Sequence, residues 1–267
     1  MDKSHPLVLR RAAINPYLRA VDLIASRLLW DARPQSWISR ARLKQLRNSH
    51  FGEKAVILCN GPSLLKSDLS LLDGIYTFGL NKINLLFDKN DFRPSCIVAM
   101  QEFVLEQNAD FYNSTEIPLF VSYTRLGTIK PRTNVMFLYS SGVRAFAKDC
   151  SMAVDNGHTV TFVALQLAFH MGFKQVALIG ADHSFATQGA PNKIDIAGDR
   201  DESHFDPNYF VGGVKWVLPD LFQSEVSYEM ARQMFEAHDR SVYNCTAGGK
   251  LEVFPRRDLC EFIERTG

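Results

Sequence analysis

Short apolar runs that end at turn residues recur along the chain from residue 54 onward. Most are about five residues long, the length of a buried strand, and helical or polar stretches separate them. Because the runs are continuously apolar, we expect a parallel sheet covered by helices on both faces, hence an α/β fold. The predicted strands are residues 55–59, 76–80, 96–100, 118–122, 135–139, 175–179 and 241–245, and the predicted helices are 63–72, 82–87, 101–108, 159–171 and 224–238.

Two segments depart from this rhythm. Residues 184–220 are rich in Gly, Pro, Asp and Asn and lose periodicity, which is typical of a functional loop. We interpret this segment as a lid whose aromatic surface closes over a ligand. The aromatic residues in question are Phe205, Tyr209, Phe210 and Trp216.

The other segment is the N-terminal arm, residues 1–50, which we separate from a catalytic domain at 51–267. The arm carries ten Lys and Arg against three Asp, a balance of +7, although the whole chain has a net charge of only +1. Apolar residues at helical spacing between Pro16 and Pro34 predict a short helix. We interpret it as packed on the main domain or on a second subunit with its arginines solvated; the alternative is a basic amphipathic helix on an anionic membrane.

The strand at 55–59 runs directly into Asn60-Gly61-Pro62-Ser63. Pro62 suits the first turn of a helix, and Gly61 permits close approach of the backbone to a neighbour. The Ser63 hydroxyl would then lie at a helix N-terminus, where a phosphate is stabilised. An ordinary tight strand–helix turn remains the alternative.

Polar side chains lie where three predicted strands end: Asn60, Asn81 and Asp182. The carboxyl ends of parallel strands converge on one edge of the sheet, where α/β proteins bind ligands. Together they predict a binding site, although Asn at a strand end also caps helices.

Three histidines are candidates for chemistry near this edge. His204, inside the predicted lid, is a candidate general base, and His183 beside Asp182 competes with it. His158, at the start of the helix at 159–171, could donate to a phosphate. For His204 the alternative is a loop histidine that is merely solvated.

Metal, dinucleotide and secretory signals are weak or missing from the sequence. The GDRDE cluster at 198–202 could hold a divalent ion but is more typical of a solvated loop. HExxH, GxxxxGK[ST], GxGxxG and GxSxG do not occur. The five cysteines have no CxxC spacing, and no signal peptide or membrane span is evident, so we expect reduced thiols and a cytoplasmic protein. We expect no nucleic-acid partner.

The order of these motifs resembles the MptE-like (DUF115) superfamily. The resemblance rests on CNGPSL at 59–64, FGLN at 78–81, the block at 156–185 and ESHF at 202–205, and it covers about residues 54–255. That group includes archaeal 6-hydroxymethylpterin diphosphokinases and bacterial surface-glycan and flagellin-modifying proteins. The same motif order is similar to bacterial CMP-sialic acid sialyltransferases of the Campylobacter type. The resemblance implies a Rossmann-like fold with a nucleotide site.

For the donor, the resemblance implies that Asn60, Gly61 and Ser63 contact the nucleotide phosphate and ribose. It implies that Asn81 holds the sugar or phosphate, and that Asp182 closes the base pocket.

For the rest of the site, the resemblance implies that Asn156-Gly157 replaces a Ser-Gly that cradles the nucleotide, and that His204 deprotonates the acceptor hydroxyl. Ser184 stands where the sialyltransferases have a Tyr that supports the leaving phosphate, and Tyr209 could supply that hydroxyl from the lid.

The leading hypothesis is an inverting glycosyltransferase of surface glycan assembly that uses a CMP-linked acidic sugar and no metal. Its partners would be the nucleotide sugar, a glycan or lipid-linked acceptor and, through residues 1–50, the inner membrane face; a homo-oligomer is possible. The alternatives are a Mg²⁺-dependent pterin diphosphokinase using ATP, with Asp182, Asp199 and Asp201 around the metal, and a non-catalytic scaffold.

Overall fold

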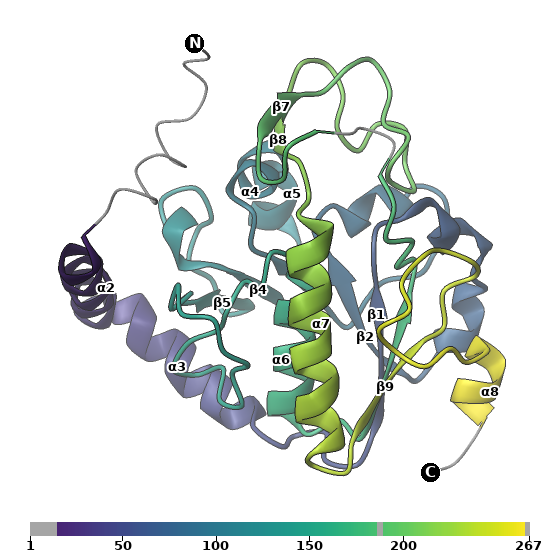
Figure 1. The fold of residues 1–267 in the computed structure, drawn as a ribbon, viewed down its shortest axis with the longest axis horizontal. Helices are drawn as coiled ribbons and strands as arrows, with labels where there is room; N and C mark the ends of the chain where they lie inside the picture. The colour runs from purple at the N-terminus through teal and green to yellow at the C-terminus, as the bar shows by residue number, and fades with distance from the viewer. Residues whose placement is uncertain (1–14, 186–188, 265–267) are drawn as a thin grey trace.

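A seven-stranded, wholly parallel sheet organises the chain (Figure 1). The computed structural model describes residues 15–185 and 189–264. The strand order is β5-β4-β3-β2-β1-β6-β9, and each strand lies within one residue of the range that the apolar runs predict. The bounds are β1 Lys54–Leu58, β2 Tyr76–Leu80, β3 Cys96–Ala99, β4 Leu119–Ser122, β5 Val135–Leu138, β6 Gln175–Ile179 and β9 Ser241–Asn244.

The direction of strand addition reverses between β1 and β6. Strands β1 to β5 step toward one edge of the sheet, whereas β6 and β9 extend the opposite edge. The connections that follow β1 and β6 therefore run in opposite directions across the sheet. A crevice opens at the carboxyl ends of strands at such a switch point.

Helices cover both faces of the sheet, as predicted, and two hydrophobic cores fill the layers between them. On one face α6 is buried along almost its whole length and packs against α7, while α3 packs on β5. The all-round apolar pattern of residues 160–171 explains why α6 lies inside. The helix bounds are α2 Pro16–Asp31, α3 Pro34–Leu46, α4 Glu102–Gln107, α5 Ala109–Ser114, α6 Val160–Met171, α7 Leu221–Glu236 and α8 Leu259–Glu264.

Two predicted helices are wrong in type. The helix predicted at 63–72 is a pair of 3₁₀ helices, η1 (Pro62–Lys66) and η2 (Leu69–Leu72). Asp68 divides them because its side chain accepts the N–H of Ser70 and starts a new turn. The helix predicted at 82–87 is likewise a 3₁₀ turn, η3 (Ile83–Leu86). Helices α5 and α8 are not anticipated by the apolar pattern.

The segment predicted as a lid is more ordered than its sequence suggests. It contains an antiparallel ribbon of β7 (Ile194–Ile196) and β8 (Lys215–Val217). Its aromatic residues are not open to solvent, because they pack on one another and on the second hydrophobic core. Phe205, Tyr209, Phe210 and Trp216 are all at most 8% exposed. Residues 186–188 of the predicted lid lie outside the described residues.

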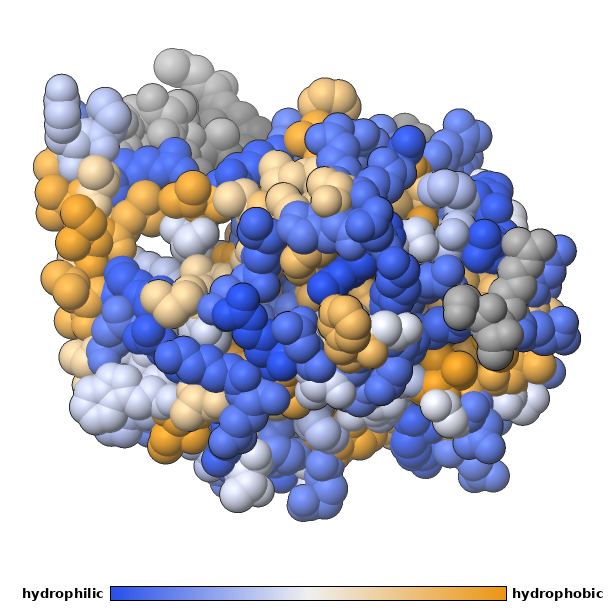
Figure 2. Space-filling view, turned by 90° about the horizontal axis from the view of Figure 1, so that it is seen from below, coloured by the Kyte–Doolittle hydropathy of each residue, from blue (hydrophilic) through white to orange (hydrophobic). Residues whose placement is uncertain are grey.

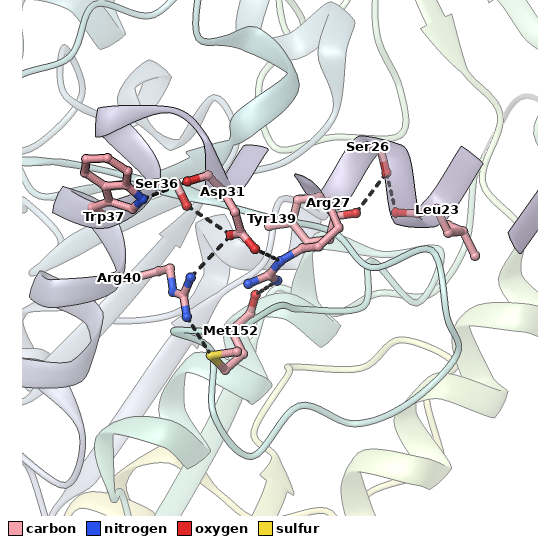
Figure 3. Close-up of polar contacts among 9 residues, drawn as sticks. All are labelled: Leu23, Ser26, Arg27, Asp31, Ser36, Trp37, Arg40, Tyr139 and Met152. Carbon is pink, nitrogen blue, oxygen red and sulfur yellow. Dashed lines mark hydrogen bonds and ion pairs between the residues drawn. The ribbon is translucent and has the colours of Figure 1, made fainter. Parts of the chain in front are cut away.

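Helix α2 packs on the domain through one face (Figure 3). Ser26 Oγ lies 2.9 Å from the hydroxyl of Tyr139, and Arg27 donates to the carbonyl oxygen of Met152. The predicted packing on the main domain is therefore observed, but Arg27 binds the domain rather than water. The first 14 residues of the predicted arm lie outside the described residues.

Two further features bear on the sequence predictions. All five cysteines are unpaired, and four of them are buried. In the part of the chain that the structure describes, no helix has the length and apolar character needed to cross a membrane.

Gly172 ends α6 in the left-handed conformation, at φ = 96°, and we expect its replacement to destabilise the fold. A Cβ at this position would lie 3.0 Å from the Cα atoms of both Asn48 and Phe51. We therefore predict that Gly172→Ala lowers the free energy of unfolding by about 2–3 kcal/mol in urea denaturation.

The matched control is Gly52→Ala, at φ = 85°, where a Cβ would have no neighbouring atom within 4 Å. This variant should lower the free energy of unfolding by only about 1 kcal/mol, the cost of placing alanine in a left-handed backbone conformation. Equal losses in the two variants would mean that the backbone contact at Gly172 is unimportant.

Candidate functional site

A cavity of about 370 Å³ opens at the carboxyl ends of β1, β2 and β6, at the switch point of the sheet. The N-terminus of α6 and the segment 201–210 form further walls, and residues 216–221 close one side. Most of the predicted site residues line it. They are Asn60, Gly61, Asn81, Asn156, His158, Asp182, His183, His204 and Tyr209.

The turn after β1 is tied to Asp182 after β6. Asp182 Oδ2 accepts from the N–H of Ser63 at 3.1 Å and from its hydroxyl at 2.6 Å. Gly61 N donates to the carbonyl oxygen of Gly180. A Cβ on Gly61 would fall 2.0 Å from Asp182 Oδ2, so the close approach requires glycine. The GPS turn thus serves to join the two strands at the switch point.

The sequence suggests the two donors of Ser63 for a phosphate, but in the structure both bind Asp182. Ser63 is buried, and neither Ser63 nor Pro62 is among the residues that line the cavity. A helix N-terminus that does reach the cavity is that of α6. Thr159, its N-cap, lines the cavity together with Val160 and Thr161. The positive end of this 12-residue helix is therefore an available anion site.

Asn60 and Asn81 each present an unsatisfied oxygen at this edge. The Oδ1 atoms of both side chains are buried and have no hydrogen-bond partner. Both residues line the cavity at the ends of β1 and β2. Buried acceptors without partners are costly, so these two oxygens indicate a ligand that offers N–H or O–H donors.

Backbone strain gathers around the same cavity. Six non-glycine residues in the described ranges have positive φ, and four of these line the cavity. Such conformations cost free energy and persist at sites where the surrounding structure enforces them. The four are Asn81 at φ = 47°, His158 at 63°, His183 at 53° and Asn192 at 62°.

His204 is oriented by a buried carboxylate. Its Nδ1 lies 2.8 Å from Asp201 Oδ2, and its ring stacks on Tyr209 at a centroid distance of 4.0 Å. Burial opposes ionisation of Asp201, but hydrogen bonds from His204 and from the N–H of Ser203 lower its pKa overall. An ionised Asp201 keeps the proton on Nδ1 and leaves Nε2 as the basic nitrogen of the ring. This is the geometry of a general base.

Tyr209 and Lys82 fix the wall that carries His204. Burial raises the pKa of Tyr209 far above its usual value, so the hydroxyl stays protonated. Lys82 Nζ donates to the carbonyl oxygen of Tyr209 at 2.6 Å and to Gln107 Oε1 at 2.9 Å. Burial lowers the pKa of Lys82 to about 8. Phe205 N also donates to the carbonyl oxygen of Asn60, which joins this wall to β1.

The two other candidate histidines also line the cavity and contact carboxylates at the start of α7. His183 Nε2 lies 2.9 Å from Glu225 Oε1 on α7, and its side chain is mostly buried. His158 is more exposed, with Nδ1 3.9 Å from Asp220 Oδ2. Both therefore point toward the N-terminal part of α7 rather than toward His204.

Asn156 and Gly157 differ in their relation to the cavity. Asn156 is exposed and lines it, whereas Gly157 is buried and does not. A Cβ on Gly157 would lie 2.2 Å from the ring of Phe162, so this glycine serves helix packing.

The side chains of the described residues do not form a set of ligands that fits a metal ion. The described residues contain no group of three or more His, Cys, Asp or Glu able to hold one. Asp201, a predicted ligand, binds His204 instead, and Asp182 binds Ser63. Asp199 is exposed in its loop.

Sequence reasoning missed two residues of this site. The sequence pattern places Asp201 in an acidic metal cluster, although its spacing of three residues from His204 is a signal for a carboxylate–histidine pair. Lys82 follows Asn81 directly, but no local pattern distinguishes a buried lysine from a surface one. Only the packing of residues 205–210 over it reveals its burial.

Comparisons with known proteins agree with this fold. A family model described as "6-hydroxymethylpterin diphosphokinase MptE-like" matches residues 35–188. A solved structure of the MAf glycosyltransferase from Magnetospirillum magneticum AMB-1 superposes with a TM-score of 0.51 at 16% identity. The match covers 85% of this chain but only 38% of that protein. Among curated proteins there is no match.

We predict that Lys82 makes stability depend on pH in a defined direction. Its pKa is about 8 in the folded protein against 10.5 for an ordinary lysine, so between these pH values the unfolded chain holds a proton that the folded chain has released. The free energy of unfolding of the wild type should therefore rise, relative to Lys82→Met, as pH increases from 8 to 10.5.

Urea denaturation of both proteins across this range tests the prediction. Lys193→Met, which removes an exposed lysine, is the control and should show no such trend. A constant difference between the wild type and Lys82→Met would contradict the effect of burial on this ammonium group.

Proposed function

The chain belongs to the MptE-like family, and on that premise we propose that it is a glycosyltransferase that uses a nucleotide-activated sugar. The observation that carries the proposal is the His204–Asp201 pair at the wall of the cavity. A histidine held this way is suited to remove a proton from an acceptor hydroxyl.

In this proposal the nucleoside binds at the ends of β1 and β2. The unpartnered oxygens of Asn60 and Asn81 would accept hydrogen bonds from ribose hydroxyls or from the amino group of a base. Their burial favours this assignment, because the ligand would supply the donors that the free protein lacks.

The phosphate would lie at the N-terminus of α6. The helix end offers partial positive charge there, and the nearby His158 offers a ring N–H donor. This replaces Ser63 of the predicted phosphate site, since both Ser63 donors are engaged by Asp182.

The reaction would proceed by direct displacement. Nε2 of His204 takes the proton of the acceptor hydroxyl while the acceptor oxygen bonds to the anomeric carbon. The bond between that carbon and the phosphate oxygen breaks, and the nucleotide leaves with the electron pair. The α6 terminus stabilises the charge that develops on the leaving phosphate. One displacement inverts the configuration at the anomeric carbon.

The charge of the cavity favours a donor with one phosphate, such as a CMP-linked sugar. Among the described residues that line it there is no Lys or Arg. A triphosphate carries more charge than such a lining neutralises. An acidic sugar could direct its carboxylate to His183, and the acceptor would be a glycan or a lipid-linked glycan.

Diphosphoryl transfer from ATP is the second candidate, favoured by the description of the matching family model. That reaction depends on Mg²⁺ held near the phosphates. The described carboxylates form no ligand group, so we derive no step through a metal.

Thermal-shift measurements with CMP, UDP and ATP, each with and without Mg²⁺, test the proposed donor class. We expect CMP alone to raise the melting temperature, because binding to the native state stabilises it by mass action. Asn60→Ala should abolish this shift. Stabilisation by ATP only with Mg²⁺ would support the diphosphokinase instead, and no response to any nucleotide would favour a scaffold.

Replacement of the base should separate binding from chemistry. We predict that His204→Ala lowers kcat by about 10²–10⁴-fold in a transfer assay while the CMP-induced shift persists. Asp201→Asn should also lower kcat, because an amide can donate to Nδ1 and so leave the proton on Nε2. Full activity of His204→Ala would eliminate it as the base.

A further inference from the structure

The outer face of α2 carries a row of large apolar side chains in contact with solvent. Four of them, at positions 17, 21, 24 and 28, recur at intervals of four, three and four residues, the spacing of helices that pack against each other. Figure 2 shows a hydrophobic patch at the left edge of the molecule, where Figure 1 has α2. The residues of this outer face are Tyr17, Leu18, Val21, Ile24, Leu28 and Leu29, each at least 60% exposed.

The inner side of α2 is fixed to the domain, so the outer face cannot turn inward. Trp30 is 3% exposed and lies 5.3 Å from the ring of Tyr123. Ser26 contacts Tyr139, and Asp31 accepts from Arg27 and Arg40 (Figure 3). The exposed stripe is therefore a fixed feature of the surface.

The charges of α2 favour a protein partner over an anionic membrane. A helix that lies on anionic lipid directs basic side chains to the headgroups beside its apolar face. Here Arg27 is directed to Asp31 and the carbonyl oxygen of Met152. Arg19 donates to the carbonyl oxygen of Gly142. Both guanidinium groups of the helix thus contact the protein's own domain.

A groove runs beside the outer face of α2, and the molecule is hollowed next to the patch in Figure 2. The groove has a volume of about 340 Å³. The outer face of α2 projects as an apolar ridge beside this groove, so the surface can be complementary to itself. Around a two-fold axis, the ridge of each copy can pack against the same surface of the other copy. The groove is lined by Leu23, Ile24, Arg27, Leu28, Tyr139, Ser141 and Ala153.

We propose that the outer face of α2 binds the same face of a second copy of this chain and forms a two-fold symmetric dimer. The two α2 helices would pack antiparallel, with the axis passing between Val21 and Ile24. Tyr17 would then meet the partner's Leu28, and Val21 the partner's Ile24. Antiparallel packing also sets the dipole ends of the two helices against ends of opposite sign. This inference is independent of the proposed function.

The exposed area is adequate for such a contact. Trp37 and Ile38 at the start of α3 are also exposed and lie next to the end of α2. Side chains of this size present on the order of 100 Å² each, so these eight offer roughly 800 Å² per copy, which is the area per partner of a standard interface.

Sedimentation equilibrium of the full chain tests the proposal. We expect a mass of twice 30.2 kDa at micromolar concentration. The double variant Val21→Glu/Ile24→Glu should halve this mass, because it buries charge at the axis. The control is Phe51→Glu, which changes a residue 75% exposed outside α2 and should leave the dimer intact. Circular dichroism establishes that each variant is folded.

Three outcomes would overturn the proposal. The first is a wild-type chain that stays monomeric throughout the micromolar range. The second is a dimer that the double variant leaves unchanged. The third is a wild-type monomer that binds vesicles of anionic phospholipid and loses this binding in the double variant, which would assign the outer face to a membrane. Nucleotide binding by the double variant tests the proposed function separately, since α2 does not line the cavity.

Discussion

The hydrogen bonds between Asp182 and Ser63 are the contact on which the cavity depends. They join the ends of β1 and β6, the two strands between which the chain reverses its direction of strand addition. The join is possible because Gly61 has no side chain in the space that the carboxylate occupies. Because Asp182 and Ser63 bind each other, the polar side chains at these strand ends with an unpartnered oxygen are Asn60 and Asn81.

The opposing wall is held by contacts of a different kind. Residues 201–210 have no regular secondary structure, yet Lys82 donates to the Tyr209 carbonyl oxygen and Lys89 forms an ion pair with Asp206. Stacked rings fill the space between these contacts. These contacts hold His204 in place at the wall of the cavity. Rigid support of this sort keeps a reacting group in its productive position.

The sequence predicts the sheet well because its signals are local. Continuous apolar runs define strands such as 175–179, and Gly172 marks the end of α6. The convergence of Asn60, Asn81 and Asp182 follows from parallel topology alone. The role of Ser63 was not predictable in the same way, since its donors are claimed by a carboxylate 119 residues away. The burial of the aromatic residues of 205–216 likewise depends on packing between distant segments, which composition does not encode.

The hydrogen bond from Phe205 N to the carbonyl oxygen of Asn60 has a consequence for how the protein could change over time. It couples the backbone next to the candidate base to the turn that carries a candidate ligand-binding group, and it involves no side chain. Substitutions at either position, other than proline at 205, therefore keep both the donor and the acceptor of this hydrogen bond. The ribbon β7–β8 and the first turn of α7 take no part in this hydrogen bond. A lineage could thus exchange one ligand for another by altering these segments while the hydrogen bond between Phe205 N and the Asn60 carbonyl oxygen is retained.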